Sequence, residues 1–249
     1  MDIRGHVVEV FSSIQGEGLH VGRRQVFVRL AGCSFGCRYC DQPEARKAPL
    51  AARFQCEPNS GRVEEAANPV TSAQVVRRAV ALDSPAGSHH AFSITGGEPL
   101  EQADFLAGIL QGLRSAARPA MLETNGVMCE EIEKVIDLVD IVSMDVKLAS
   151  TTGLPTPFET HRRFLAAAVC KRVYVKAVIA DGTTDEEIEA LGELICSQSR
   201  TIPLVLQPVA EGQMEPPKPG RLLRMQSLLL RRLADVRVIA QMHKILGLP

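Results

Sequence analysis

Three cysteines stand close together near the start of the chain, in the stretch G-C-S-F-G-C-R-Y-C-D-Q from Gly32 to Gln42. The spacing C-x-x-x-C-x-x-C places the thiols of Cys33, Cys37 and Cys40 on one tight loop. Soft thiolates select zinc, copper(I) or an iron–sulfur cluster, and three ligands leave a four-point site one short, as at a catalytic metal with an open position. A structural zinc site usually has a second Cys/His pair, and none follows at the expected distance.

Polar residues also gather where most of the later strands are expected to end. These stretches are Thr95–Pro99, Glu123–Gly126, Ser143–Lys147, Gln207–Pro208 and Gln241–Lys244. One of them alone could be an ordinary loop, because Gly, Asn and Pro are common in turns. Active sites of parallel barrels lie at the rim where the strands end, so we expect all of these segments to meet the cysteine loop there.

Hydrophobic periodicity predicts the strands and helices that position these groups. We expect strands at Val7–Phe11, Gln25–Leu30, Ala91–Thr95, Ala120–Glu123, Ile141–Asp145, Arg172–Ile179, Leu204–Gln207 and Val236–Ala240. We expect helices that begin near Thr71 and after Thr184, which opens a capping box, and helices at Asp104–Arg114, Glu130–Leu138, Glu159–Val169 and Arg221–Leu233. Repeated strand–helix units predict an α/β fold, a partial (β/α) barrel of parallel strands.

The length of 249 residues, with 45% hydrophobic side chains, allows a full core, and we expect one domain over residues 1–249. Residues 43–70 are rich in Pro, Ala, Glu and Asn without a sustained period. They predict an insertion after the cysteine loop rather than a second domain.

Net charge and cysteine content indicate which binding partners and which cellular compartment suit the protein. The 28 basic and 29 acidic residues give a net charge of −1, so no global field recruits nucleic acid or an anionic membrane, and a small-molecule partner is favoured. Seven cysteines, an odd number, argue against a disulfide framework. The chain has no apolar leader or long apolar run, and a reducing cytoplasm suits its thiols.

The motifs together resemble the 7-carboxy-7-deazaguanine synthases of the radical S-adenosylmethionine (SAM) superfamily. The resemblance rests on the cysteine spacing, on T-G-G-E-P, E-T-N-G and L-Q-P, and on three longer stretches, Ser13–Gly18, Val26–Cys33 and Gln241–Pro249. It implies hydrogen abstraction from 6-carboxy-5,6,7,8-tetrahydropterin, ring contraction and loss of ammonia, which give 7-carboxy-7-deazaguanine.

The resemblance also assigns cofactors and site residues. It implies a [4Fe–4S] cluster on Cys33, Cys37 and Cys40, and SAM contacts from Tyr39, Gly96, Gly97, Glu98, Ser143, Lys147 and Gln207. It implies substrate contacts from Gln15, Glu17, Arg29, Thr95, Glu123, Asn125, His243 and the terminal Pro249. It also implies a flavodoxin- or ferredoxin-type electron donor, a homodimer and a magnesium ion. Gln42 stands where the family commonly has a hydroxyl ligand to that ion, so its amide oxygen would have to substitute.

Several of these residues could also have a structural role that involves no ligand. Thr95–Pro99 could be a simple turn, and Lys147 a solvated loop lysine. Arg29 lies near the end of an apolar strand and needs an anion there, which could be a substrate carboxylate or an internal pair with Glu17. We expect Cys56, Cys129, Cys170 and Cys196 to be structural, and His20, His89, His90 and His161 to be exposed.

Two other classes of protein stay open on the sequence. One is a radical SAM activating enzyme that makes a glycyl radical on a partner protein, which would share the cysteine loop. The other is a non-catalytic protein that binds zinc or an iron–sulfur cluster.

Overall fold

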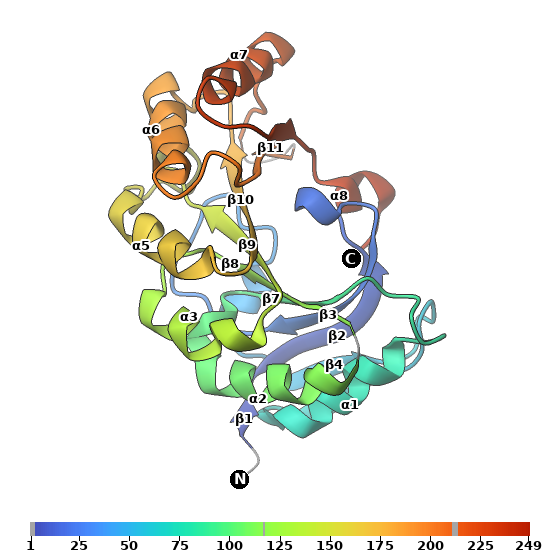
Figure 1. Cartoon of the computed structure of the whole chain (residues 1–249). Helices are drawn as coiled ribbons and strands as arrows, with labels where there is room; N and C mark the ends of the chain where they lie inside the picture. Colours follow the sequence, from blue (N-terminus) through green and yellow to red (C-terminus); the bar gives the residue numbers. More distant parts are fainter. Residues whose placement is uncertain (1–2, 117, 211–213) are drawn as a thin grey trace.

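The computed structural model describes residues 3–116, 118–210 and 214–249. Within these ranges, ten strands form one curved sheet in the order β12-β11-β10-β9-β8-β7-β3-β2-β4-β5. Figure 1 shows the larger helices following one another around the outside of this sheet, while α8 lies on its other side. No helix in the described part of the chain has the length and apolarity needed to cross a membrane.

Seven neighbouring strands run parallel and carry the fold that the sequence predicts. They are β3 (Arg24–Leu30), β7 (Phe92–Gly96), β8 (Ala120–Thr124), β9 (Ile141–Val146), β10 (Arg172–Ile179), β11 (Leu204–Pro208) and β12 (Val236–Val238). The α-helices are α1 (Ser72–Leu82), α2 (Ala103–Leu113), α3 (Cys129–Val135), α4 (Ala149–Thr152), α5 (Phe158–Ala168), α6 (Asp185–Cys196), α7 (Pro219–Leu230) and α8 (Met242–Leu246). Short 3-10 turns lie at Gly18–His20, Pro43–Arg46, Pro99–Gln102, Arg114–Ala116 and Ile136–Leu138. The α/β partial barrel is confirmed, and the predicted caps at Thr71 and Thr184 are present.

The sheet is mostly parallel, as expected, but not throughout. Strand β2 (Val7–Ile14) pairs with β3 in the antiparallel sense, from Val7 opposite Leu30 to Ile14 opposite Arg24. The connection between the two strands is too short for the crossover that a parallel pair requires. The chain therefore enters the barrel through a hairpin, and the loop of that hairpin carries Gln15 and Glu17.

Residues 43–70 have more structure than the sequence suggests. Strands β4 (Ala51–Gln55) and β5 (Val63–Ala67) form an antiparallel hairpin, and β4 pairs with β2 in parallel. Next along the chain, β6 (Val70–Thr71) pairs with β1 (Arg4–Gly5). The β4–β5 hairpin therefore extends the main sheet, while β1 and β6 form a separate two-stranded sheet.

Alternation along the parallel strands separates the core from the lumen. On β10, Val175, Ala177 and Ile179 belong to the large core between sheet and helices. Tyr174 faces the other way and packs with apolar side chains of four neighbouring strands or loops, namely Ala91, Met121, Ile141 and Val205. Two residues further along each strand the inward side chains become polar, so the lumen has an apolar floor and a polar upper layer.

Candidate active site

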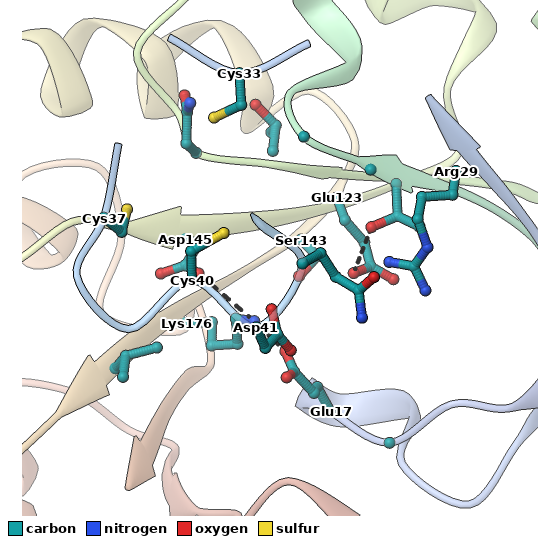
Figure 2. Close-up of a pocket in the computed structure, with 18 of the residues that line it drawn as sticks. Glu17, Arg29, Cys33, Cys37, Cys40, Asp41, Glu123, Ser143, Asp145 and Lys176 are labelled. Carbon is teal, nitrogen blue, oxygen red and sulfur yellow. Dashed lines mark hydrogen bonds and ion pairs between the residues drawn. The ribbon is translucent and has the colours of Figure 1, made fainter. Parts of the chain in front are cut away.

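A cavity opens above the apolar floor, at the carboxyl ends of the strands. The cysteine loop, the β2–β3 hairpin, the ends of β7 to β11 and the C-terminal tail all contribute to its wall. Apart from Glu98, every candidate site residue predicted from the sequence lines this cavity. In Figure 2 the cysteines lie toward one side of the view, and Arg29 and Glu123 lie toward the other.

The cysteine loop follows β3 directly and is held by backbone bonds. Gly32 N donates to Ala45 O at 2.8 Å, and Ser34 N donates to the Glu101 carboxylate at 2.6 Å. All three loop cysteines are free and partly exposed. Burial is the main cause that raises the pKa of the Cys33 and Cys37 thiols, so a bound metal has to displace protons from them.

The spacing of the three sulfurs bears on what they can hold. The thiols are close enough for Cys33 and Cys40 to influence the titration of Cys37. In the described residues, ligand atoms of Glu17, Asp41 and His243 lie within 4.8 Å of one another. The three thiols on one loop are a separate donor set, of the kind that holds an iron–sulfur cluster.

The paired glycines of Thr95–Pro99 line the cavity and also allow the backbone to pack closely against the cysteine loop. Glu98 N donates to Gly32 O at 2.6 Å, and a Cβ atom at Gly97 would collide with the main chain of Gly32 and approach the Cβ of Cys33. A side chain here would push the first cysteine out of place. This close backbone approach explains the glycine better than a turn alone does.

Glu98 is the predicted site residue that the structure does not bring to the cavity wall. Its carboxylate is buried and accepts hydrogen bonds from Leu100 N at 3.1 Å, Thr124 Oγ1 at 2.9 Å and Asn125 N at 2.7 Å. Burial outweighs these bonds and raises its pKa to about 7. The side chain ties the T-G-G-E-P turn to the end of β8, so its contacts lie within the protein.

Only 12% of the Lys147 side chain is exposed, so the alternative of a solvated loop lysine is wrong. Its Nζ donates to Tyr39 Oη and to Asp145 Oδ2, both at 2.9 Å, and it lies 5.2 Å from the centre of the Tyr39 ring. Burial alone would lower its pKa, but the Asp145 charge more than offsets this and raises it. The Lys147 ammonium thus anchors the end of the cysteine loop to β9.

Two oxygens on the lumen side lack a partner within the described chain. They are Oδ1 of Asp145 on β9 and Oε1 of Gln207 on β11, and both residues line the cavity. Ser143, on the same strand as Asp145, is buried and bonds to Tyr174. Buried acceptors without donors are costly, so these positions fit a polar ligand that brings N–H or O–H groups.

Glu123 is fixed by three donors, one in the β2–β3 loop and two on β7. Its Oε1 accepts from Gln15 Nε2 at 2.8 Å and from Ser93 Oγ at 2.6 Å, and its Oε2 lies 3.4 Å from Thr95 Oγ1. Gln15 Nε2 also reaches the fully buried Gln25 at 3.0 Å. The carboxylate is therefore held rigidly at the cavity wall before any ligand binds.

Glu17 and the C-terminal tail meet at the mouth of the cavity. Glu17 accepts hydrogen bonds from Lys176 and, at 2.6 Å, from Gln241. Met242 N donates to Gly16 O at 2.9 Å, and a Cβ at Gly16 would collide with the His243 ring. His243 and Pro249 line the cavity.

The C-terminal tail is only partly buried. Ile245 and Leu246, on the outer side of α8, remain 69% and 54% exposed. The tail thus reaches the cavity through its two ends, with an apolar surface left between them.

None of the four histidines that we expected to be exposed is so: His20 and His90 are half-buried, and the other two are buried. His161 Nδ1 donates to Gly126 O at 3.0 Å, while its Nε2 accepts from Lys147 N at 3.2 Å. His89 bridges Asp83 and Ser12 at 3.0 and 2.8 Å. The prediction fails because loop and helix-start positions become buried when they join neighbouring strands.

Sequence reasoning missed Lys176, Asp145, Asp41 and Gln241, which also line the cavity. The signal for Lys176 was present: it is the one charged residue inside the apolar run Val173–Ile179, and strand alternation places it in the lumen. Asp145 stood inside a recognised motif without being singled out.

The comparisons with known proteins agree with this geometry. The model of the radical SAM superfamily matches residues 28–195. The 7-carboxy-7-deazaguanine synthase of Geobacter sulfurreducens is 42% identical over 96% of this chain and 96% of its own length. The synthase of Methanothermobacter thermautotrophicus is 34% identical over 99% and 98%. In structure, QueE from Escherichia coli covers 96% of this chain and 95% of its own, with a TM-score of 0.59 and 20% identity.

A partial barrel with three free thiols on the loop after its first parallel strand defines a radical SAM protein. The chain belongs to the radical SAM superfamily and, within it, to the family of 7-carboxy-7-deazaguanine synthases.

Proposed function

We propose that this protein converts 6-carboxy-5,6,7,8-tetrahydropterin to 7-carboxy-7-deazaguanine with loss of ammonia, in the biosynthesis of 7-deazapurines such as queuosine. The observation that carries the proposal is that the cysteine loop lines one cavity together with Arg29, Glu123, His243 and Pro249. The 42% identity to a synthase of that name, over nearly the whole chain, supports it. We further propose that residues 1–249 act as one radical SAM domain.

The proposal gives the cysteine side of the cavity to the cofactors. Cys33, Cys37 and Cys40 would hold a [4Fe–4S] cluster. Tyr39, Ser143, Lys147, Gln207 and the backbone of Gly96 and Gly97 would contact SAM, whose amino and hydroxyl groups suit the unpartnered oxygens of Asp145 and Gln207. When bound, these cofactors supply one-electron hydrogen-abstraction chemistry. The chain's own contribution is to hold them in register and to exclude water.

The other side of the cavity would bind the pterin. Arg29 can hold the substrate carboxylate through its planar fork of donors. Glu123 and Glu17 can accept hydrogen bonds from ring and amino N–H groups, and Gln15, Thr95, Asn125 and His243 complete the polar edge. An analogue that lacks these groups would leave buried partners unpaired, so the fixed position of Glu123 would select strongly against it.

We also propose a magnesium ion beside the cysteine loop. Gln42 lines the cavity, and a carboxylate oxygen of its neighbour Asp41 lies within 4.8 Å of a Glu17 carboxylate oxygen and of a His243 ring nitrogen. Oxygen atoms of Asp41 and Gln42 are ligands of the kind that magnesium takes. Titration of turnover with a chelator and then with added Mg²⁺ tests this, because activity indifferent to both would mean that no such ion takes part.

Electron supply and assembly complete the proposal. We infer that a flavodoxin- or ferredoxin-type protein supplies the electron and that the protein forms a homodimer. An apolar hollow beside α8, lined in part by Ile14, Val238 and Leu246, offers a surface for a second copy. Sedimentation of the wild type and of Val238→Glu tests the dimer.

One assay tests the central proposal. The reconstituted protein is incubated anaerobically with SAM, a reductant and 6-carboxytetrahydropterin, and the product mass is measured. A mass equal to that of 7-carboxy-7-deazaguanine supports the proposal. Cleavage of SAM without a change in the pterin would refute it, and a protein without visible charge-transfer absorption would point back to zinc.

A further inference from the structure

Lys176 is an ammonium group inside an otherwise apolar strand. It lies on β10, directly opposite Asp145 of β9 in the parallel register, and only 8% of it is exposed. Since paired residues of neighbouring strands point to the same face, both side chains enter the lumen. A lysine is almost never placed there unless charges surround it.

The surrounding charges come from two different parts of the chain. Lys176 Nζ forms an ion pair with Glu17 in the β2–β3 hairpin and lies 3.5 Å from Asp145 Oδ2. Figure 2 shows Lys176 between these acidic groups. Asp145 in turn accepts from Lys147. A row of alternating charges, Glu17–Lys176–Asp145–Lys147, therefore runs from the pterin side of the cavity to the cysteine loop.

The position of the Glu17 carboxylate in the lumen depends on this row of charges. It sits in a loop rather than a strand, and among the described residues its other side-chain hydrogen bond comes from Gln241 in the tail. Without Lys176, its carboxylate would share a poorly solvated cavity with Asp145 and Glu123. Like charges in such a setting repel, and a buried carboxylate without a cation is unstable, so Glu17 would turn toward solvent.

We propose that Lys176 is a positioning residue that holds the Glu17 carboxylate in the lumen for the substrate. It acts through Glu17 and touches no reacting atom. This inference rests on the proposed function, because Glu17 is taken there as a pterin contact.

A double-mutant cycle on the holoenzyme tests it. Affinity for 6-carboxytetrahydropterin is measured by anaerobic calorimetry, with SAM present and no reductant, for the wild type, Lys176→Met, Glu17→Gln and the double variant. We expect Lys176→Met to weaken binding at least about 10-fold, because it breaks a buried ion pair. In the Glu17→Gln background the same change should cost no more than about 2-fold. Fold-changes that simply multiply would overturn the proposal.

The controls separate positioning from folding. Lys134→Met removes a largely exposed lysine, 3.9 Å from Glu131 on α3, and should leave binding unchanged. Lys176→Arg keeps the charge and should restore part of the affinity. The cluster spectrum and SAM affinity report whether each variant is intact.

A crystal structure of substrate-free Lys176→Met decides the matter independently of the substrate. We expect the Glu17 carboxylate to be displaced from the lumen by more than about 1 Å, a shift large enough to spoil a substrate contact. An unmoved Glu17 would refute the positioning role. A wild type that does not bind the pterin would refute the proposed function, while this structure would still decide the role of Lys176.

Discussion

Arg29 and Glu9 face each other across the β2–β3 pair, and Arg29 Nε donates to Glu9 Oε1 at 2.9 Å. The guanidinium lies 5.4 Å from the centre of the Phe11 ring. The internal partner of Arg29 is therefore Glu9, whereas the sequence suggested Glu17. Glu9 orients the fork from one side, and Arg29 still lines the cavity, where a carboxylate ligand can reach it.

Arg29→Lys should lower kcat/KM for the pterin by about 10-fold or more, because the charge stays but the paired donors are lost. SAM affinity should not change. The matched control is Arg53→Lys, since Arg53 also binds Glu9 but is an exposed residue, and such pairs contribute little. Unchanged pterin affinity in Arg29→Lys would leave Arg29 with a structural role only.

Changing any one of Cys33, Cys37 or Cys40 to Ala should abolish SAM cleavage, because each removes one of three cluster ligands. Cys56→Ala is the control, since Cys56 lies in the β4–β5 hairpin region away from the cavity wall. Visible absorption and release of the nucleoside product are the readouts. A reducible cluster that still cleaves SAM in Cys37→Ala would show that the ligands are different ones.

Adding a few residues after Pro249, or making His243→Ala, should cut pterin turnover strongly and leave uncoupled SAM cleavage largely intact. The reason is that Pro249 and His243 line the cavity, so added residues or a lost imidazole would alter the place where the pterin binds. The same extension placed before Met1 serves as the control. If the C-terminally extended protein keeps full activity, the carboxylate has no role and His243 alone remains.

Stability should fall as the pH drops below about 6.5, in part because of His161. Burial, the main cause, lowers its pKa from 6.5 to about 4. The unfolded chain therefore takes up this proton first, and a stabilising contribution present above pH 6.5 is lost as the pH falls toward 4. At pH 5 this single group should cost about 2 kcal/mol.

Anaerobic urea unfolding at pH 7.5 and pH 5.0 measures this effect. His161→Gln cannot titrate in this range, so its stability should change less between the two pH values than that of the wild type. Equal changes in both proteins would mean that His161 does not contribute.

The barrel strands could be predicted because their pattern is local. Runs such as Arg172–Ile179 are apolar on both faces, and their ends are marked by Gly, Pro and Asn. The β4–β5 hairpin escaped prediction because Val63–Ala67 reads V-E-E-A-A, without alternation, and its stability comes from pairing with β2 through β4. The antiparallel sense of β2 follows from the short β2–β3 loop. The motifs in that loop were considered in the prediction, but its length was not.

The candidate site could be assembled from motifs, but its internal bonds could not. Gln15 and Glu123 stand 108 positions apart, and nothing local shows that one donates to the other. Likewise Lys176 is recognisable as unusual, but its pairing with Glu17 depends on how the hairpin folds over the lumen. Glu98 is a further case, because nothing local shows that a carboxylate in a glycine turn accepts hydrogen bonds from Thr124 Oγ1 and Asn125 N at the end of β8.

One end of the open sheet is an edge strand, whose outer side carries backbone N–H and C=O groups that no neighbouring strand in the described part of the chain pairs with. Strand β5 lies at one end of the order and pairs with β4. Such an edge invites further strands, but Glu64 and Glu65 sit exposed at its centre, so a second copy laid alongside would bring carboxylates together. The hairpin that widens the sheet thus carries its own protection against self-association, and replacing both glutamates with Thr should make the protein prone to aggregate on storage.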